Sequence, residues 1–359
     1  MCIAFLCLYD DVEDGEKERE RERDKSRSST WNSDSIGNLS GRYSAIVAFN
    51  RDEFLERETR CPHWWKEEGT EGSKQIYGGR DMRAGGSWMG VTRCGRIAFL
   101  TNVREKDPVE EKEKEKEEDD DDWGKKNQSA EDLPEILRRR QQQQTPSTSC
   151  QSRGLLIKNY LVSETAPEEY CKEVVSNSSE RYRGYNLFVG KLGGQGKKPA
   201  FAHVSNRGMK SEGGVQVMRS GGVWGISNGP LGSWWKVRKG CEKIKRDLPA
   251  ALEERVNMKM KKAVTGQVLS DWIFDNVLMD GERAPEDQVP ETGLGLDIEL
   301  PNSSIYVEPF EREAWGKFGT RSSTVILFDK VDKKVLWYER TFEGSKAKFS
   351  QQAEVFSVE

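Results

Sequence analysis

Short apolar runs separated by polar breaks make up most of the chain outside a few charged stretches. Runs of this length, bounded by glycine and polar residues, are typical of β-strands. Two pairs of runs are separated by only three residues, which favours antiparallel hairpins. The predicted strands are residues 3–9, 43–49, 87–92, 96–101, 185–191, 200–205, 223–227, 324–330 and 334–342.

Apolar residues recur at helical spacing in four other segments, which are residues 154–163, 166–175, 233–248 and 266–279. Two groups of antiparallel strands separated by helices predict an α+β fold of stacked sheets with helical outer layers. The sequence contains no internal repeat. We therefore expect one domain that spans residues 1–359.

Charged and low-complexity stretches interrupt this pattern. Residues 11–40 are rich in Glu, Lys and Arg, and residues 105–149 contain EEKEKEKEEDDDD and a run of glutamines. A shorter, split stretch covers residues 176–180 and 193–198. Such sequences bury too little apolar surface to offset the entropy of ordering them. The two long stretches are therefore predicted to be disordered insertions, and protein binding by the acidic loops is the alternative.

Charge and hydropathy exclude several protein classes. The formal net charge is −4, with 57 basic and 61 acidic residues, so no basic face for nucleic acid is expected. No apolar run approaches the roughly 20 residues of a membrane helix. The N-terminal sequence MCIAFLCLYDD lacks the basic leader of a targeting peptide. These features predict a cytoplasmic protein without a membrane span.

Cysteine and histidine usage narrows the chemistry further. Seven scattered cysteines without a CxxC pair are typical of reduced thiols rather than of disulfides or a zinc site. The two histidines, His63 and His203, exclude a histidine-rich metal site. They also leave few candidates for the base of a Cys-His triad. No metal is therefore expected.

Antiparallel pairing of the first two strands would place Cys2 beside residues 50–53. Without Met1, Cys2 would carry a thiol and a free α-amine, which titrates near pH 7.7–8.0 in model compounds. Such an amine can act as the base for its own side chain. Arg51 would favour the thiolate, and Asp52 would orient the amine.

Two asparagines complete this candidate site. Asn102 and Asn228 would offer side-chain N–H groups to a developing oxyanion. The alternative is that Cys2 only begins a buried strand, since free cysteine is among the most buried residue types. The residues alone leave both interpretations open.

Polar residues also collect at the ends of the other two hairpins. Strand pairing would place residues 85–87 beside residues 101–102, and residues 320–321 beside residues 339–340. Strand ends commonly hold functional sites.

The sequence resembles the NRDE family, also called the Transport and Golgi organisation protein 2 family, over nearly its whole length apart from the charged insertions. Each motif is short, but their order and spacing make the set specific. The marks are Met1 with Cys2, NRDE at 50–53, Arg57, Pro62, Trp64, GGRD at 78–81, GGSWMGV at 85–91, AFLTN at 98–102, SRG at 152–154, YNLFVG at 185–190, GISNGPL at 225–231 and GTRSSTVILFD at 319–329.

That family is similar to cysteine-type N-terminal-nucleophile hydrolases, such as penicillin V acylases and bile-salt hydrolases, which cleave non-peptide amides. The resemblance implies a four-layer αββα sandwich. NRDE spaces its arginine and aspartate differently from those enzymes, so the role of the aspartate departs from their pattern. By resemblance the site residues are Cys2 as nucleophile, Arg51 and Asp52 after the second strand, the asparagines Asn102 and Asn228, and the late arginine Arg321.

Members of the family are linked to Golgi organisation and secretion, to lipid or acyl-CoA metabolism and to haem trafficking. Three functions therefore stay open. The first is a cysteine amidohydrolase or acyltransferase on a small amide or thioester, with no cofactor required. The second is a non-catalytic carrier of haem, lipid or acyl-CoA, and the third is a secretory-pathway adaptor. A cytoplasmic protein associated with Golgi or mitochondria is expected in each case.

One short motif bears on the second function. Cys61, Pro62 and His63 resemble a short haem-responsive Cys-Pro motif. The thiolate of such a cysteine can ligate haem iron. Tryptophans such as Trp64 and Trp88 belong either to the core or to a pocket for an acyl chain or a flat ring.

Overall fold

The fold is seen in a computed structural model that describes residues 2–9, 39, 41–104, 151–178, 181–193, 198–207, 214–257, 266–312 and 316–359. The predicted insertion at 105–149 lies outside these residues. So does the insertion at 11–40, except for Leu39. Leu39 is buried and belongs to the same apolar cluster as Tyr43 and Ile46.

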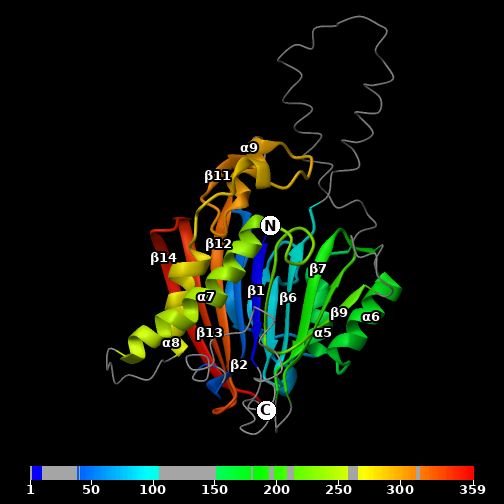
Figure 1. The fold of residues 1–359 in the computed structure, drawn as a ribbon. Helices are drawn as coiled ribbons and strands as arrows, with labels where there is room; N and C mark the ends of the chain where they lie inside the picture. The colour runs from blue at the N-terminus through cyan, green and yellow to red at the C-terminus, as the bar shows by residue number, and fades with distance from the viewer. Residues whose placement is uncertain are drawn as a thin grey trace, which may run out of the picture.

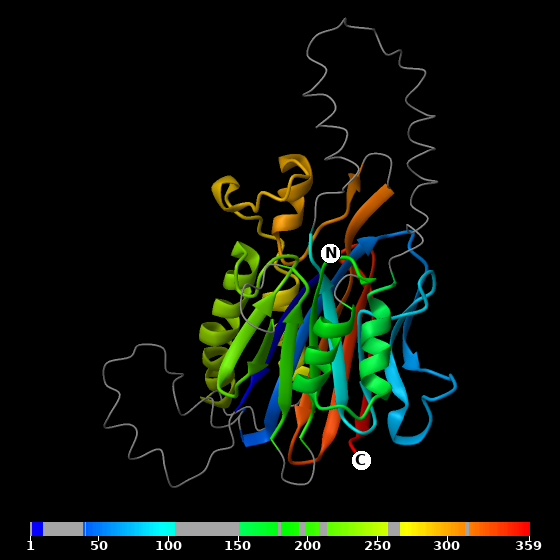
Figure 2. The same cartoon turned by 90° about the vertical axis from the view of Figure 1, so that its right-hand side faces the viewer.

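Two seven-stranded antiparallel sheets form the centre of the described chain (Figures 1 and 2). The first sheet has the strand order β10-β1-β2-β12-β13-β14, and β11 pairs with the outer part of β12. Its strands are β1 (Cys2–Leu8), β2 (Tyr43–Phe54), β10 (Gly222–Ile226), β11 (Phe310–Arg312), β12 (Gly316–Asp329), β13 (Lys334–Ser345) and β14 (Lys348–Ser357).

The second sheet runs from β3 to β9 in sequence order, so each strand pairs with its neighbour in the chain. Most of these connections are short, but the one from β6 to β7 spans residues 103–184 and contains α5 and α6. Its strands are β3 (Thr59–Trp64), β4 (Ile76–Asp81), β5 (Met89–Thr92), β6 (Arg96–Asn102), β7 (Tyr185–Lys191), β8 (Ala200–Ser205) and β9 (Val215–Met218).

Helices cover the outer face of each sheet (Figure 1). The second sheet carries α5 (Gly154–Val162) and α6 (Pro167–Ser178). The first sheet carries α7 (Trp235–Asn257), α8 (Gly266–Ile273) and the π-helical turn η3 (Phe274–Leu278) that continues α8. The remaining short helices are η1 (Gly72–Lys74), η4 (Glu286–Gln288), α9 (Leu296–Glu299) and η5 (Pro301–Ser303).

Residues 286–312, here called the cap segment, contain η4, α9, η5 and β11. Figure 1 shows α9 and β11 at the end of the sheets where the N-terminus lies. That end also holds the polar motif residues of β2, so the cap segment and the candidate site share one region of the molecule.

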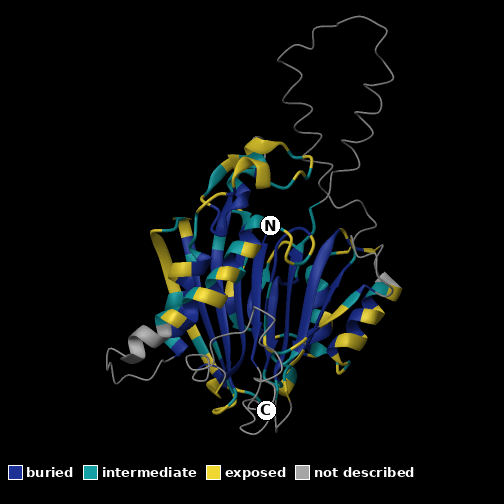
Figure 3. Ribbon diagram, in the orientation of Figure 1, coloured by how far each residue is buried: buried dark blue, intermediate teal, exposed yellow. Residues whose placement is uncertain are grey.

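Strand alternation divides the apolar residues into three cores. The strands of both sheets are mostly buried (Figure 3). On β1, Ala4 and Leu6 face the second sheet, whereas Ile3 and Phe5 face the helices. β1 is therefore buried on both faces, as its continuous apolar sequence requires. Gly240 allows α7 to approach closely, because a side chain there would clash with the ring of Phe5.

The α+β class and the two antiparallel sheets are confirmed, whereas several strands were missed. β3, β4, β9, β11 and β14 had no prediction, and the hairpin of residues 324–342 is followed by β14 rather than ending the fold.

The register of that hairpin was also predicted wrongly. Thr324 pairs with Glu339 and Ser323 with Arg340, so Thr320 and Arg321 lie further along β12. The four-residue turn after Asp329, which pairs with Lys334, sets this register.

Candidate functional site

The NRDE motif lies inside β2, with a neighbouring strand on either side. Cys2 of β1 pairs with Arg51, and Thr320 of β12 pairs with Asp52. Because successive side chains alternate across a strand, Arg51 faces the second sheet and Asp52 faces the helical layer. The structure thus brings Cys2, Arg51 and Asp52 together across neighbouring strands.

Cys2 is buried, with 7% of its surface exposed. Burial and the negative charge of Asp52 raise the pKa of its thiol, while the amino terminus, a backbone hydrogen bond from Asp52 and the charge of Arg51 act in the opposite direction. Ser227 Oγ donates a hydrogen bond to the Cys2 carbonyl at 2.8 Å. The hydrogen bond from Ser227 thus fixes the backbone of Cys2.

Arg51 enters the space between the sheets, where its guanidinium lies 4.2 Å from the centre of the Trp88 ring. Burial lowers its pKa, and the charges of Glu53 and Cys2 oppose that shift. Glu339 lies in the same inter-sheet layer and accepts a hydrogen bond from Thr324 at 2.8 Å. Burial raises the pKa of Glu339 to about 7.

Asp52 is only 1% exposed and accepts a hydrogen bond from Thr320 Oγ1 at 2.7 Å. The same hydroxyl accepts the backbone N–H of Val307, from the cap segment, at 2.8 Å. Burial raises the pKa of Asp52, and the positive charge of Lys236 opposes this shift. Asp52 is therefore part of an enclosed polar layer beneath the cap segment.

Lys236 was not predicted as a site residue. It lies in the first turn of α7, is 1% exposed, and donates from Nζ to the Asn302 carbonyl at 2.8 Å. Burial lowers its pKa to about 8, against the charge of Asp52. The only sequence signal was a lysine between the apolar residues Trp235 and Val237 at the start of the helix.

The two asparagines meet at the same end of the sheets. Asn228 Nδ2 donates to the backbone carbonyl of Asn102 at 2.7 Å, and Arg104 N donates to the Asn228 carbonyl at 2.9 Å. Thr101 Oγ1 and Asn186 Nδ2 both donate to the Ser227 carbonyl. These bonds join the loop after β10 to the end of β6.

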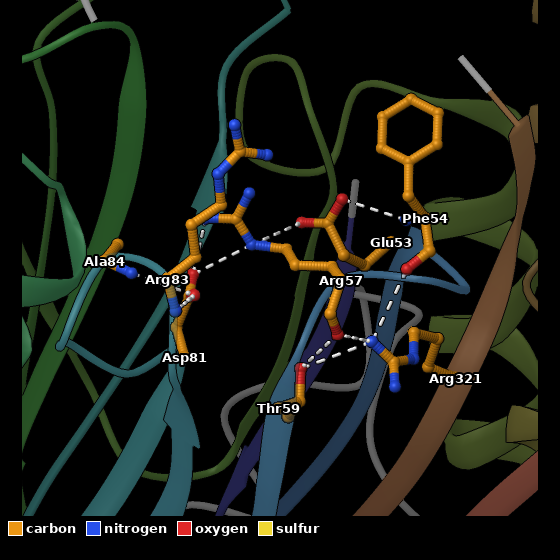
Figure 4. Close-up of polar contacts among 8 residues, drawn as sticks. All are labelled: Glu53, Phe54, Arg57, Thr59, Asp81, Arg83, Ala84 and Arg321. Carbon is orange, nitrogen blue, oxygen red and sulfur yellow. Dashed lines mark hydrogen bonds and ion pairs between the residues drawn. The ribbon is translucent and has the colours of Figure 1, made fainter. Parts of the chain in front are cut away.

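Arg321 is anchored to the turn after β2. It lies where the register of β12 shifts, between Thr320 and Ser322. Its Nη1 donates to the carbonyls of Phe54 and Arg57 and to Thr59 Oγ1 (Figure 4). Arg321 therefore fixes the turn between β2 and β3.

A second network joins the NRDE and GGRD motifs (Figure 4). Arg57 donates to Asp81 Oδ2 from Nε at 3.0 Å and from Nη2 at 2.7 Å, and Glu53 Oε2 lies 3.8 Å from Arg57 Nε. Asp81 Oδ1 also accepts the backbone N–H groups of Arg83 and Ala84. Because Glu53 belongs to β2 and Asp81 to β4, this network connects the two sheets.

The cap segment is held to the sheets by a buried ion pair. Arg104, just beyond β6, pairs with Glu299 of α9, and both side chains are almost fully buried. Burial and the nearby charge of Arg312 lower the pKa of Arg104 to about 9. Its guanidinium also lies 5.3 Å from the centre of the Trp234 ring.

Within the part of the chain that the structure describes, no group of three or more His, Cys, Asp or Glu side chains is placed to bind a metal. Cys61 is exposed, and His63 Nδ1 lies 2.8 Å from the Cys61 carbonyl. Among the described helices, none is both long and apolar enough to cross a membrane.

Known proteins resemble this chain in sequence. The family profile described as Transport and Golgi organisation 2 matches residues 29–120 and 133–344. The Transport and Golgi organization protein 2 homolog of Bos taurus is 28% identical over 309 residues, which cover 84% of this chain and 88% of that protein. The Homo sapiens homolog is 25% identical over 305 residues, covering 83% and 87% respectively.

Solved structures resemble the chain more distantly. A Caenorhabditis elegans ortholog of N-acylethanolamine-hydrolyzing acid amidase has a TM-score of 0.36 and 9% identity, covering 91% of this chain and 92% of that one. A mutant conjugated bile acid hydrolase from Clostridium perfringens has a TM-score of 0.37 and 8% identity, covering 100% and 97%. The family match covers most of the chain, including Arg51, Asp52, Asn102, Asn228 and Arg321, but not β1 with Cys2 or β14, and the chain belongs to the Transport and Golgi organisation 2 family.

Proposed function

We propose that this chain is an N-terminal-nucleophile cysteine hydrolase or acyltransferase with an αββα arrangement, acting on a small amide or thioester. The observation that carries the proposal is the pairing of Cys2 with Arg51, which sets a thiol beside a buried guanidinium and a backbone hydrogen bond from Asp52. A nearby cation favours the thiolate.

Removal of Met1 would supply the missing base. The freed α-amine of Cys2 would take the thiol proton, as an N-terminal amine does for other nucleophiles. Asp52, which is buried in the neighbouring strand, would accept a hydrogen bond from that amine once its carboxyl group is ionised. The proposal therefore needs no histidine.

The reaction would proceed in two steps. The Cys2 sulfur forms a bond to the carbonyl carbon, and the carbonyl electron pair moves to oxygen, where Asn102 and Asn228 donate hydrogen bonds. The carbon–nitrogen or carbon–sulfur bond then breaks, and the leaving group takes the proton held by the α-amine. Water, or an acceptor amine or alcohol, attacks the resulting thioester and regenerates the thiol.

One observation favours a second candidate, a carrier of haem, lipid or acyl-CoA. The Cys2 thiol is buried with a raised pKa, and Asn228 Nδ2 already donates to Asn102. Such a site would bind a ligand without turnover. The adaptor hypothesis relies on acidic loops that lie outside the described residues. The family description supports a role connected with Golgi organisation in each case.

Intact-mass spectrometry of the native protein, incubated with a panel of acyl amides and acyl thioesters, tests the proposal. We expect a chain that lacks Met1 and gains one acyl group at Cys2. Cys2→Ala should abolish acylation, whereas Cys61→Ala, which removes an exposed thiol, should not change it. A retained Met1, or acylation that persists in Cys2→Ala, would contradict the proposal.

A further inference from the structure

The buried ammonium group of Lys236 needs a negative charge nearby. An ammonium group enclosed in protein is strongly unfavourable unless it is hydrogen-bonded and paired. Lys236 is 1% exposed, and its Nζ donates a hydrogen bond to the neutral carbonyl of Asn302. A carboxylate in the same layer is therefore required to balance the charge.

Asp52 is a buried carboxylate tied to the same segment. It accepts a hydrogen bond from Thr320 Oγ1, which in turn accepts the backbone N–H of Val307. Lys236 donates directly to Asn302, a few residues earlier in the cap segment. Lys236 and Asp52 are thus anchored to one short piece of backbone, Lys236 directly and Asp52 through Thr320.

Their charges are also coupled. Burial raises the pKa of Asp52, and Lys236 is the strongest influence against that shift. Burial lowers the pKa of Lys236 to about 8, and Asp52 is again the strongest opposing influence.

We infer that Lys236 is a positioning residue of the Cys2 site, whose ammonium keeps Asp52 ionised so that Asp52 can hold the α-amine of the processed chain. The role at Cys2 rests on the proposed function, whereas the coupling between Lys236 and Asp52 does not. No lysine of α7 was expected to act in this way from the sequence.

Other charged and titratable groups face this pair. Asp52 interacts with Glu53 on its own strand, with the amino terminus of the chain, with Arg104 beyond β6 and with Tyr306 of the cap segment. Arg104 is already paired with Glu299. Loss of Lys236 would therefore remove the strongest cation acting on Asp52.

The full-length chain tests the coupling directly. The carboxyl carbon of Asp52 is followed by NMR with pH and assigned from Asp52→Asn. Lys236→Met should raise the titration midpoint of Asp52 by about one pH unit or more. Lys245→Met, at an exposed position of the same helix, should leave it in place, and Lys236→Arg should restore it.

A reciprocal measurement covers the case in which Lys236→Met does not fold. The Lys236 ammonium is then titrated in the wild type and in Asp52→Asn, where its midpoint should fall. If neither midpoint moves, the inference is overturned. In a preparation that acylates Cys2, the midpoint on the acid side of the pH–activity profile should move to higher pH in Lys236→Met. If the wild-type chain never becomes acylated at Cys2, the proposed function is overturned. The shift in the titration midpoint of Asp52 would still show whether Lys236 and Asp52 are coupled.

Discussion

Arg51 and Asp52 are adjacent in the sequence and lie on opposite faces of β2. Arg51 stacks on Trp88 between the sheets, whereas Asp52 accepts a hydrogen bond from Thr320 on the helical side. Asn50 shares the face of Asp52 and donates to the carbonyls of Leu278 and Ile305. The motif therefore supplies one pair of polar side chains to each layer.

Arg51→Met should slow alkylation of Cys2 by iodoacetamide at pH 8 several-fold. The arginine charge lowers the thiol pKa, so its loss raises the pKa and reduces the thiolate fraction. Loss of the contact with Trp88 should also reduce stability by about 1 kcal/mol. Labelling rates by peptide mass spectrometry measure the effect, and Arg83→Met, at an exposed position, is the control. Equal rates would show that Arg51 does not influence the thiol.

Arg57 and Asp81 should show a measurable coupling energy. Their ion pair is partly buried, and one carboxylate oxygen accepts two N–H groups, so we expect about 1 kcal/mol from a double-mutant cycle with Arg57→Ala and Asp81→Asn. Urea unfolding of the four proteins measures it. Lys74 and Glu164 form an exposed pair that should give a smaller value. A coupling of zero for Arg57 and Asp81 would exclude a stabilising link between the sheets here.

Glu339→Gln should change how stability depends on pH. Burial raises the folded-state pKa of Glu339 to about 7. Below the pKa of the unfolded state both states are protonated, so the wild type keeps the full stability that this difference in pKa provides. Between that value and pH 7 the unfolded state loses its proton first, and stability falls by about 1.4 kcal/mol per pH unit. The glutamine variant should lack this decline. Melting temperatures at pH 5 and pH 8 test it, with Glu343→Gln, at an exposed position, as the control. A decline in melting temperature of the same size in Glu339→Gln and Glu343→Gln would contradict the assignment of this pH dependence to Glu339.

His203→Phe should make the fold less sensitive to acid. His203 is buried against Phe188, with ring centres 4.6 Å apart, and among the described residues neither ring nitrogen has a hydrogen-bond partner. Burial lowers its pKa to about 4, so stability is complete above the unfolded value near 6.5 and falls as the pH drops toward 4. Thermal unfolding at pH 5 and pH 7.5 tests this. His63→Phe should keep the wild-type acid sensitivity, and an identical response in His203→Phe would refute the prediction.

The sequence predicted those strands whose residues are apolar on one or both faces. β1 and β2 were recognised because both are buried, and the proximity of Cys2 to Arg51 follows from hairpin geometry whatever the length of the connection. β14 was missed because this edge strand, KFSQQAEVFS, is mostly exposed and has no apolar run. β4 was missed because the two glycines and the aspartate in its sequence, IYGGRD, are typical of turns.

Side-chain partners at the site were predicted less well. Cys2, Arg51, Asp52, Asn102 and Asn228 lie at one end of the sheets, but nothing local shows that Arg321 donates to backbone carbonyls of the turn between β2 and β3. The burial of Lys236 depends on a contact with Asn302, 66 residues away. Such pairings are set by tertiary packing, which periodicity does not report.

The position of β1 between β2 and β10 has a consequence during synthesis. One side of β1 has no partner until the ribosome has made and released the chain through Ile226, the end of β10. At about 5–20 residues per second, this delay lasts on the order of tens of seconds. Cys2 is therefore accessible to modifying enzymes during this interval. Once β10 pairs, Cys2 is buried, so its thiol is easier to modify before the domain closes than afterwards.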